Sequence, residues 1–454
     1  MRFRLTYYVL FWLTCFCQVI YAGTTGKLSG KVTEKETGGP LIGANVMIDG
    51  TPMGAATDVD GNYYILQVPP GTYQVRFTMI GYQTVVMNDV RVRVDLTTTL
   101  NGELVESAVG LDEVIVQAER PMIQTDVTYS QANISSEEVE MLPVEEFEDV
   151  LALQAGVVST GGEIHVRGGR GGEISYMVDG ITVTDPYNSG IAVEIENNAI
   201  QELQFISGTF NAEYGQAMSG IVNIITKDGD YTRYSGSVSG NVGDYISSGL
   251  GSSYKDEFGK IISDTLFPQI NQLNLNTISD IKANFEGPII PGVLSFFVSG
   301  RKKVNNGYLF GERIFNPGSY SWSETQNMFL IGTLGNGETP VDSLWLPMYY
   351  QDSLRTYING ERDAQKFDRV SMNTSDQITY QAKLSWRVNP KIKFSYNRMF
   401  SDTKSQNYSH GYLWNPDGRP FSFNTRTGNI ARLDVSINQS TFANMMFSNA
   451  TNHF

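Results

Sequence analysis

The sequence predicts a mainly β chain in three parts: an N-terminal β-sandwich, a mixed α+β domain, and the antiparallel strands of an incomplete transmembrane β-barrel. Three observations predict this order. Short β-rich runs separated by turn residues fill the first part, and helix-like stretches among further β runs mark the second. Strict alternation of apolar and polar residues over 378–388 marks the third, since eleven such residues fit one membrane-spanning strand.

Composition narrows the classes of function. The chain has 454 residues, with 48 Asp and Glu against 33 Lys and Arg, so its net charge is −15. An acidic chain with scattered basic residues is a poor partner for nucleic acid. Three His and two Cys disfavour a His/Cys metal cluster and a Cys–His nucleophile.

Residues 1–22 have the pattern of a signal peptide. Two Arg precede an apolar stretch over 5–20, and Ala22-Gly23 supplies the small residues of a cleavage site. An uncleaved membrane anchor is the alternative, but no positive flank follows the stretch. Cys15 and Cys17 both lie in this segment, so cleavage leaves an exported chain without cysteine.

The first domain, expected over 23–104, shows short β runs bounded by Gly, Pro and Asp-Gly turns, which favour a small sandwich. The runs are 27–32, 44–48, 63–68, 73–79, 84–87 and 90–96. The residues of 43–46, 57–63 and 70–73 resemble the carboxypeptidase regulatory-like domain, which implies a prealbumin-like sandwich. Asp58-x-Asp60-Gly61 is similar to the start of a calcium loop, but Pro69 stands where the bidentate acid belongs, so a hairpin turn is the better interpretation.

An acidic linker is predicted over 105–124. A solvated linker explains most of its charges. Within it lies a β-branched stretch that starts with an acid and ends before Pro121, outside any obvious sheet, and such a stretch can add to a partner as an edge strand. Its residues are Glu113, Val114, Ile115, Val116, Gln117 and Ala118.

The middle domain, over 125–229, begins with two short helices interrupted at Leu142-Pro143. Five further segments follow in order: 164–169, 176–181, 200–205, 212–215 and 220–226. Their order and spacing resemble the plug domain of TonB-dependent outer-membrane receptors. The sandwich ahead of it is similar to the arrangement in SusC-like and Oar-like receptors of this family.

That resemblance has several implications. The segment Glu113 to Ala118 corresponds to the TonB box, and TonB with its inner-membrane energising complex is the implied partner. The implied location is the bacterial outer membrane, with the N-terminal domain and plug facing the periplasm. Outer-membrane lipid, an extracellular ligand of unknown class and a surface lipoprotein are further implied partners. The plug motif positions are Arg167, Gly168, Asp179, Gly180, Tyr214, Gly215 and Gly220.

The third part, over 230–454, predicts strands separated alternately by short turns and long polar loops, as in outer-membrane barrels. The strands are 232–242, 279–287, 293–302, 378–388, 390–400, 431–438 and 441–449, and the long loops are 243–278, 303–377 and 401–430. A soluble half-buried hairpin has the same period and is the alternative. A barrel wide enough for a plug has about 22 strands, so the chain is expected to be an N-terminal fragment.

No catalytic or metal site emerges, no cofactor is predicted, and the chain is not expected to be an enzyme. Gly168-Gly169-Arg170-Gly171-Gly172 lacks the spacing of a phosphate-binding loop and favours a tight turn. His165 is a lone strand histidine with an expected packing role. Asp179-Gly180 favours a hairpin turn over a catalytic acid.

Three functions stay open at this point. The first is energised uptake of a scarce or large ligand, with the plug gating the barrel. The second is a non-transporting outer-membrane binding or surface-assembly receptor, as in the Oar-like group. The third is a periplasmic protein that never inserts into the membrane. The variable loops that select a ligand do not reveal its class.

Overall fold

The structure is a computed structural model. The residues that it describes are 24–107, 114–117, 130–144, 146–160, 163–185, 190–208, 217–245, 254–255, 261–262, 273–312, 328–331, 344–347, 369–412, 416–438 and 441–454. The predicted signal peptide lies outside them, as do Glu113, Ala118, Tyr214 and Gly215.

The N-terminal domain is a β-sandwich, as predicted, and is called the sandwich below. One sheet has the order β4-β1-β7, with β8 also paired to β1, and the other has the order β3-β2-β5-β6-β9. Its core lies between the sheets and contains Leu28, Val46, Tyr63, Phe77 and Val92, all at most 1% exposed. The strands are β1 (Gly26–Glu34), β2 (Asn45–Ile48), β3 (Gly54–Ala56), β4 (Asn62–Val68), β5 (Gly71–Thr78), β6 (Val85–Val92), β7 (Thr97–Thr99), β8 (Gly102–Leu104) and β9 (Val114–Gln117).

Two expectations for this domain need correction. The runs 84–87 and 90–96 were expected as separate strands, but β6 joins the first run to the start of the second, and 93–96 form a turn. Within β6, Asp89 takes a left-handed conformation at φ 59° and the ladder with β5 shifts register there. This is a β-bulge within one strand. The segment expected to lie outside any sheet is itself a strand, since β9 pairs in parallel with β6.

The turn at Asp58 has a structural explanation. Its carboxylate Oδ1 accepts the backbone N–H of Asp60 at 2.9 Å and that of Asn62 at 2.8 Å. Such an Asx turn lets the side chain replace missing backbone partners. One carboxylate oxygen of Asp58 is therefore used to fix the chain before β4.

The middle domain, called the plug below, is a five-stranded sheet of order β10-β15-β16-β13-β14. A separate hairpin, β11-β12, and two short helices cover it. Ser135 and Glu138 form a capping box that begins the first helix, which ends before Pro143. The elements are β10 (Ser130–Ser135), α2 (Ser136–Met141), α3 (Phe147–Ala152), β11 (Val157–Thr160), β12 (Glu163–Val166), η1 (Gly171–Glu173), β13 (Ile174–Val178), β14 (Ile181–Thr182), η2 (Asn197–Ala199), β15 (Ile200–Ser207) and β16 (Gly220–Thr226).

The third part is an antiparallel sheet of order β17-β20-β21-β26-β27-β28-β29, called the wall below. Each predicted strand of this part falls in it. The strands are β17 (Ser235–Gly243), β20 (Ile278–Ile290), β21 (Leu294–Asn305), β26 (Thr374–Asn389), β27 (Ile392–Gln406), β28 (Ser422–Ser436) and β29 (Phe442–His453). Most are longer than predicted. In particular, β27 and β28 take up both ends of the loop expected over 401–430.

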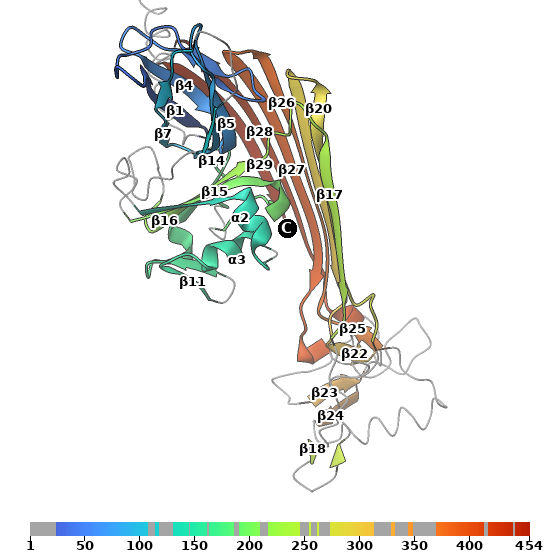
Figure 1. The fold of residues 1–454 in the computed structure, drawn as a ribbon. Coiled ribbons are helices and arrows are strands. Elements are labelled where there is room, and N and C mark those ends of the chain that lie inside the picture. The colour runs from blue at the N-terminus through green and yellow to red at the C-terminus, as the bar shows by residue number, and fades with distance from the viewer. Residues whose placement is uncertain are drawn as a thin grey trace, which may run out of the picture.

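Smaller elements lie in the connections of the wall. They are β18 (Tyr254–Lys255), β19 (Ile261–Ile262), β22 (Phe310–Glu312), β23 (Met328–Ile331), β24 (Leu344–Pro347), β25 (Arg369–Ser371), η4 (His410–Tyr412) and η5 (Pro416–Gly418). Figure 1 shows several of them beyond one end of the long strands.

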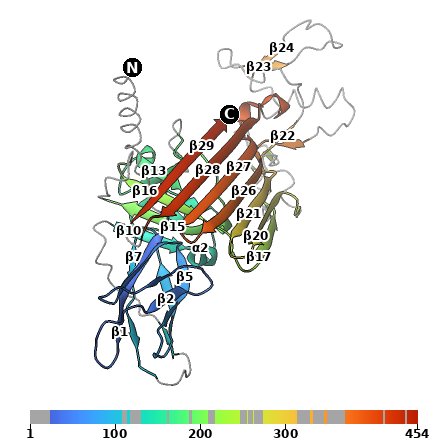
Figure 2. The ribbon, with the colours of Figure 1, turned by 90° about the horizontal axis from the view of Figure 1, so that it is seen from above.

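The two faces of the wall differ in chemistry, as the alternation predicts. In β26, Leu384 and Trp386 are 46% and 47% exposed on one face, whereas Lys383 and Ser385 are 4% and 0% exposed on the other. Figures 1 and 2 show the plug against one face of the wall, with the sandwich beside the plug at the opposite end of the strands from β22–β25. The plug therefore covers the buried part of the polar face, whereas β17 is exposed along almost its whole length. Among the described residues, no helix is long and apolar enough to cross a membrane.

Candidate functional site

The plug meets the wall through buried polar groups, and Asp179 is at the centre of one cluster. Asp179 and Gly180 have φ of 48° and 82° and join β13 to β14, which confirms the predicted hairpin turn. The carboxylate of Asp179 is buried and accepts the Thr226 backbone N–H at 2.9 Å and the Thr226 hydroxyl at 2.7 Å. From the wall, Lys383 Nζ and Asn397 Nδ2 donate to it, each at 3.2 Å.

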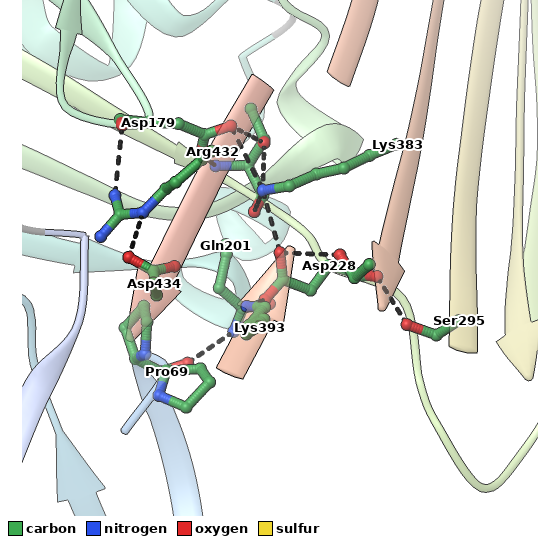
Figure 3. A network of polar contacts seen from close by, with 12 residues as sticks. Pro69, Asp179, Gln201, Asp228, Ser295, Lys383, Lys393, Arg432 and Asp434 are labelled. Atoms are coloured by element: carbon green, nitrogen blue, oxygen red, sulfur yellow. Dashed lines mark hydrogen bonds and ion pairs between the residues drawn. The ribbon is translucent and has the colours of Figure 1, made fainter. Parts of the chain in front are cut away.

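A second carboxylate shares the same lysine. Lys383 Nζ lies 3.0 Å from Asp228 Oδ1, and Lys393 on β27 pairs with the other oxygen of Asp228 (Figure 3). Burial alone raises the pKa of a carboxyl, but the two ammonium groups outweigh it and hold the pKa of Asp228 well below its usual range. The Asp228 carbonyl also accepts the Ser295 hydroxyl at 3.0 Å. Asp228 is thus fixed to β21, β26 and β27 where the chain leaves the plug.

Arg432 on β28 completes this cluster. Its Nε donates to Asp434 at 2.7 Å, and its Nη1 reaches the main-chain oxygen of Asp179 at 3.4 Å. Figure 3 shows Arg432 and Lys383 approaching the Asp179 turn from different strands of the wall. The turn is therefore held from two sides.

Arg301 on β21 is the centre of a second cluster. It is 4% exposed and makes paired hydrogen bonds to Asp280, from Nε at 2.8 Å and from Nη2 at 2.7 Å. Its Nη1 contacts two plug carboxylates, Glu146 at 3.1 Å and Glu196 at 3.2 Å. Burial raises the pKa of Glu196 to about 7, although the Arg301 charge opposes that shift. Lys303 adds a further pair to Glu146 at 2.8 Å.

Glu194 makes a third attachment of the plug to the wall. Its Oε1 accepts Gln377 Nε2 at 2.6 Å, and its Oε2 accepts the Ser401 hydroxyl at 3.0 Å. Arg426 Nη1 lies 3.9 Å from the same Oε2. In each plug–wall ion pair of these three clusters, the carboxylate belongs to the plug and the cation to the wall.

Apolar packing accompanies the charges. The main hydrophobic core of the plug includes four side chains from the wall: Phe297, Met399, Ile430 and Met446. Each lies on the polar, plug-facing side of its strand, next to the charged clusters. The plug and the wall therefore share one core.

The sandwich borders the same interface. A cavity of about 460 Å³ lies between the three parts, lined by the Pro69–Tyr73 loop of the sandwich, by Asp179 and Asp228 of the plug, and by wall residues that include Arg387 and Lys393. Burial raises the pKa of Tyr73, which lies near Arg387. Polar contacts also attach the sandwich directly. Gln201 Nε2 donates to the Pro70 carbonyl (3.2 Å), Ser436 Oγ donates to Gln67 Oε1 (2.6 Å), the Val94 N–H donates to Glu202 Oε2 (3.3 Å), and Arg91 forms an ion pair with Glu138 (3.3 Å).

The predicted plug motif residues are only partly brought together. Asp179 and Gly180 lie at the wall, whereas Arg167 and Gly168 lie after the hairpin β11-β12, with φ of 49° and 79° and with the side chain of Arg167 exposed. Gly220 begins β16, where a Cβ would lie 3.3 Å from both γ carbons of Val166. His165 Nδ1 is 3.1 Å from the carbonyl of Gly169, within the same turn.

Sequence reasoning missed most of the interface. Lys383 and Arg387 were recognised as polar positions of an alternating strand, but no partner was assigned to them. A lysine on the polar face of a membrane-length strand was the available signal, because an uncompensated charge is costly where the plug excludes water. Asp228, Lys393, Arg432, Arg301, Glu146, Glu194 and Glu196 were not singled out.

Comparison with known proteins identifies the first two domains. Residues 28–116 match the CarboxypepD_reg-like domain, and residues 123–222 match the TonB-dependent Receptor Plug Domain. The first match extends into β9, so that strand lies within the limits of the sandwich family.

Full-length relatives agree with these matches. The chain is 28% identical over 251 residues to the TonB-dependent transporter Oar of Myxococcus xanthus, which covers 53% of this chain and 23% of that protein. It is 29% identical over 231 residues to the TonB-dependent receptor SusC of Bacteroides thetaiotaomicron, which covers 46% of this chain and 22% of the relative. The matched part is thus less than a quarter of each relative's length.

Solved structures include the outer membrane transporter YddB from Escherichia coli, with 10% identity, a TM-score of 0.42, and coverage of 68% of this chain and 37% of that one. The chain thus carries a CarboxypepD_reg-like domain followed by a TonB-dependent receptor plug domain, and its relatives are TonB-dependent transporters and receptors.

Proposed function

We propose that this chain acts in a TonB-dependent outer-membrane receptor that takes up a scarce or large ligand, with the plug gating the lumen of a barrel. The observation that carries the proposal is the attachment of the plug to the polar face of the wall by buried ion pairs, through Lys383 and Arg301 above all. A plug that gates a lumen must stay attached to the wall at rest and must also be able to detach from it.

The outward face of the wall supports a membrane location. Its exposed side chains include Ile281, Phe285, Leu384, Trp386 and Phe447. Exposed apolar residues that alternate with buried polar ones along membrane-length strands are typical of outer-membrane barrels. In this arrangement the sandwich lies on the periplasmic side, because its Gln67 contacts Ser436, at the end of β28 from which a short connection leads to β29.

A polar interface suits reversible movement of the plug. If an apolar interface opened, it would expose hydrophobic surface to the water that fills the lumen. When ion pairs open, water solvates the freed Lys and Asp side chains and repays part of the lost attraction. Ligand binding at the outer side then needs only to shift the balance between docked and released plug, and TonB supplies the remaining work through β9.

The experiment measures plug movement without knowledge of the ligand. Thr379 on β26 is 2% exposed and lies between Gln377 and Lys383, both of which bind the plug. A single cysteine at Thr379→Cys should react with a maleimide in energised cells, and the reaction should slow after a protonophore collapses the proton gradient. A cysteine at the exposed Ser422 provides the control for expression and access, since its labelling should not depend on the gradient.

Ile115→Pro tests the TonB box in the same assay. Proline removes one backbone donor from β9, so energised labelling at Thr379→Cys should fall to the level seen with the protonophore. Ile115→Val keeps the donor and should label like the parent. Energised labelling that persists in Ile115→Pro would exclude this segment as the TonB box.

A second candidate is a non-transporting outer-membrane binding or surface-assembly receptor. The sandwich favours it, because it contacts both the plug and the wall and borders the cavity between them. Labelling at Thr379→Cys that is the same with and without the proton gradient would support this candidate over the first.

A further inference from the structure

The strand assigned as the TonB box is already part of a sheet on one side. β9 pairs in parallel with β6, with Val86 opposite Ile115 and Asn88 opposite Gln117. It is the last strand in the order β3-β2-β5-β6-β9, and no other strand in the described part of the chain pairs with it. Within the described part of the chain, one edge of β9 is therefore without a partner strand, so a further strand can pair there.

The strand that holds β9 also leads to the plug. Just beyond the β9 pairing, Arg91 of β6 forms an ion pair with Glu138 of α2 at 3.3 Å. Two residues after β6 ends, the Val94 N–H donates to the buried carboxylate of Glu202 on β15. β6 thus connects the TonB-box strand to the plug through the body of the sandwich.

We propose, on the basis of the function proposed above, that the sandwich presents the TonB box, and that TonB adds its own strand to the free edge of β9 while β9 stays paired to β6. The complex would be one continuous sheet, with TonB supplying the strand next to β9. This route needs no ladder to break, because the occupied edge and the free edge of β9 are different. It also avoids the entropy cost of ordering a flexible peptide at the moment of binding.

The sequence around β9 defines the chemistry of the partner. Asp112, Glu113 and Glu119 flank β9 in the sequence, and Arg120 is the one basic residue among residues 111–120. A strand that adds beside this segment should come from a basic surface, since like charges placed opposite each other weaken a strand pair. The partner is thus an exposed, basic edge strand of the periplasmic domain of TonB.

A disulfide between β6 and β9 tests whether TonB binds β9 while it stays paired to β6, or only after β9 has left β6. Asn88→Cys with Gln117→Cys places two cysteines at partnered positions of the ladder, and both natural cysteines lie in the first 22 residues. If the sandwich presents β9, the oxidised double variant should bind the periplasmic domain of TonB with a Kd within about threefold of its reduced form. Loss of binding on oxidation that reduction restores would overturn the proposal, because it would mean that β9 must leave β6. The single variant Asn88→Cys controls for effects of the reductant.

A synthetic peptide of residues 111–120 gives an independent measurement. Because the peptide must be ordered on binding, it should bind the TonB domain at least about tenfold more weakly than the whole chain. Equal or tighter binding by the peptide would overturn presentation, since it would show that the sandwich hinders access. If neither the chain nor the peptide binds the TonB domain, the proposed function fails, and presentation fails with it.

Discussion

Replacing Lys383 by methionine tests whether charge pairs hold the plug on the wall. The change keeps most of the side-chain volume but leaves the carboxylates of Asp179 and Asp228 without their shared cation. Removing one partner of a buried pair costs about 3–5 kcal/mol. Asp228 retains Lys393 and Asp179 retains its Thr226 hydrogen bonds, so we expect the lower end of that range, about 3 kcal/mol.

That loss can be measured as an opening equilibrium. A cysteine at Thr379 lies under the plug, so its rate of labelling reports the fraction of released plug when closing is faster than reaction. A cost of about 3 kcal/mol corresponds to a roughly 150-fold increase in that rate for Lys383→Met. Lys302→Met is the matched control, because Lys302 pairs with Asp376 at an exposed position worth at most about 1 kcal/mol.

The reasoning is refuted if Lys383→Met accelerates labelling no more than Lys302→Met does. A second variant makes the interpretation specific. Asp179→Asn in the Lys383→Met background removes one uncompensated carboxylate, so it should return part of the lost attachment. If Asp179→Asn instead raises the labelling rate by the same factor with and without Lys383→Met, Asp179 and Lys383 do not act as a pair.

Two further predictions concern the junctions of the plug. Burial raises the pKa of Glu202 to about 7, against the Val94 hydrogen bond that lowers it. Glu202 therefore binds its proton more tightly when it is buried in the docked state than when it is solvated, with a pKa near 4.5, in the released state. Docking of the sandwich should weaken as pH rises from about 4.5 to 7, and it should stay weaker above that range. Hydrogen exchange at 90–96, corrected for intrinsic rates, should show this slope, and Glu202→Gln should flatten it; an unchanged slope would assign it to another group. Gly229 has φ +81°, and a Cβ there would lie 2.2 Å from the carbonyl oxygen of Phe296, whereas Gly292 at φ +74° has open space. Gly229→Ala should therefore destabilise the plug–wall junction by roughly 3 kcal/mol and Gly292→Ala by only about 1 kcal/mol, and equal thermal shifts for the two variants would contradict this account.

Local patterns in the sequence predicted the elements of the fold well. Leu142-Pro143 marked the end of α2, and the alternation over 378–388 marked β26. These features depend on neighbours within a few residues, so the chain itself carries the information. The strands of the wall were underestimated because β27 and β28 continue with polar residues on both faces, where hydropathy no longer distinguishes strand from loop.

The candidate site could not be predicted in the same way. Lys383 and Asp179 are 204 residues apart in the chain, and only the packing of the plug against the wall brings them together. The pairing of β9 with β6 was missed for a related reason. A short apolar run indicates a strand, but not the strand beside which it lies. The TonB-box assignment itself stays a prediction, as do the roles of the plug motif residues.

The division of charge across the plug–wall interface has an electrical consequence. The plug carries Asp179, Glu196 and Asp228, while the wall carries the cations that neutralise them. The carboxylates of the plug therefore neutralise the cations of the wall that they contact. If the plug withdraws, its carboxylates leave with it, and the ammonium and guanidinium groups of Lys383, Lys393 and Arg301 face the lumen with less compensation. In the proposed function, this local gain of positive charge on the wall would favour anions over cations beside Lys383 and Lys393, whereas Arg301 would keep the wall carboxylate of Asp280.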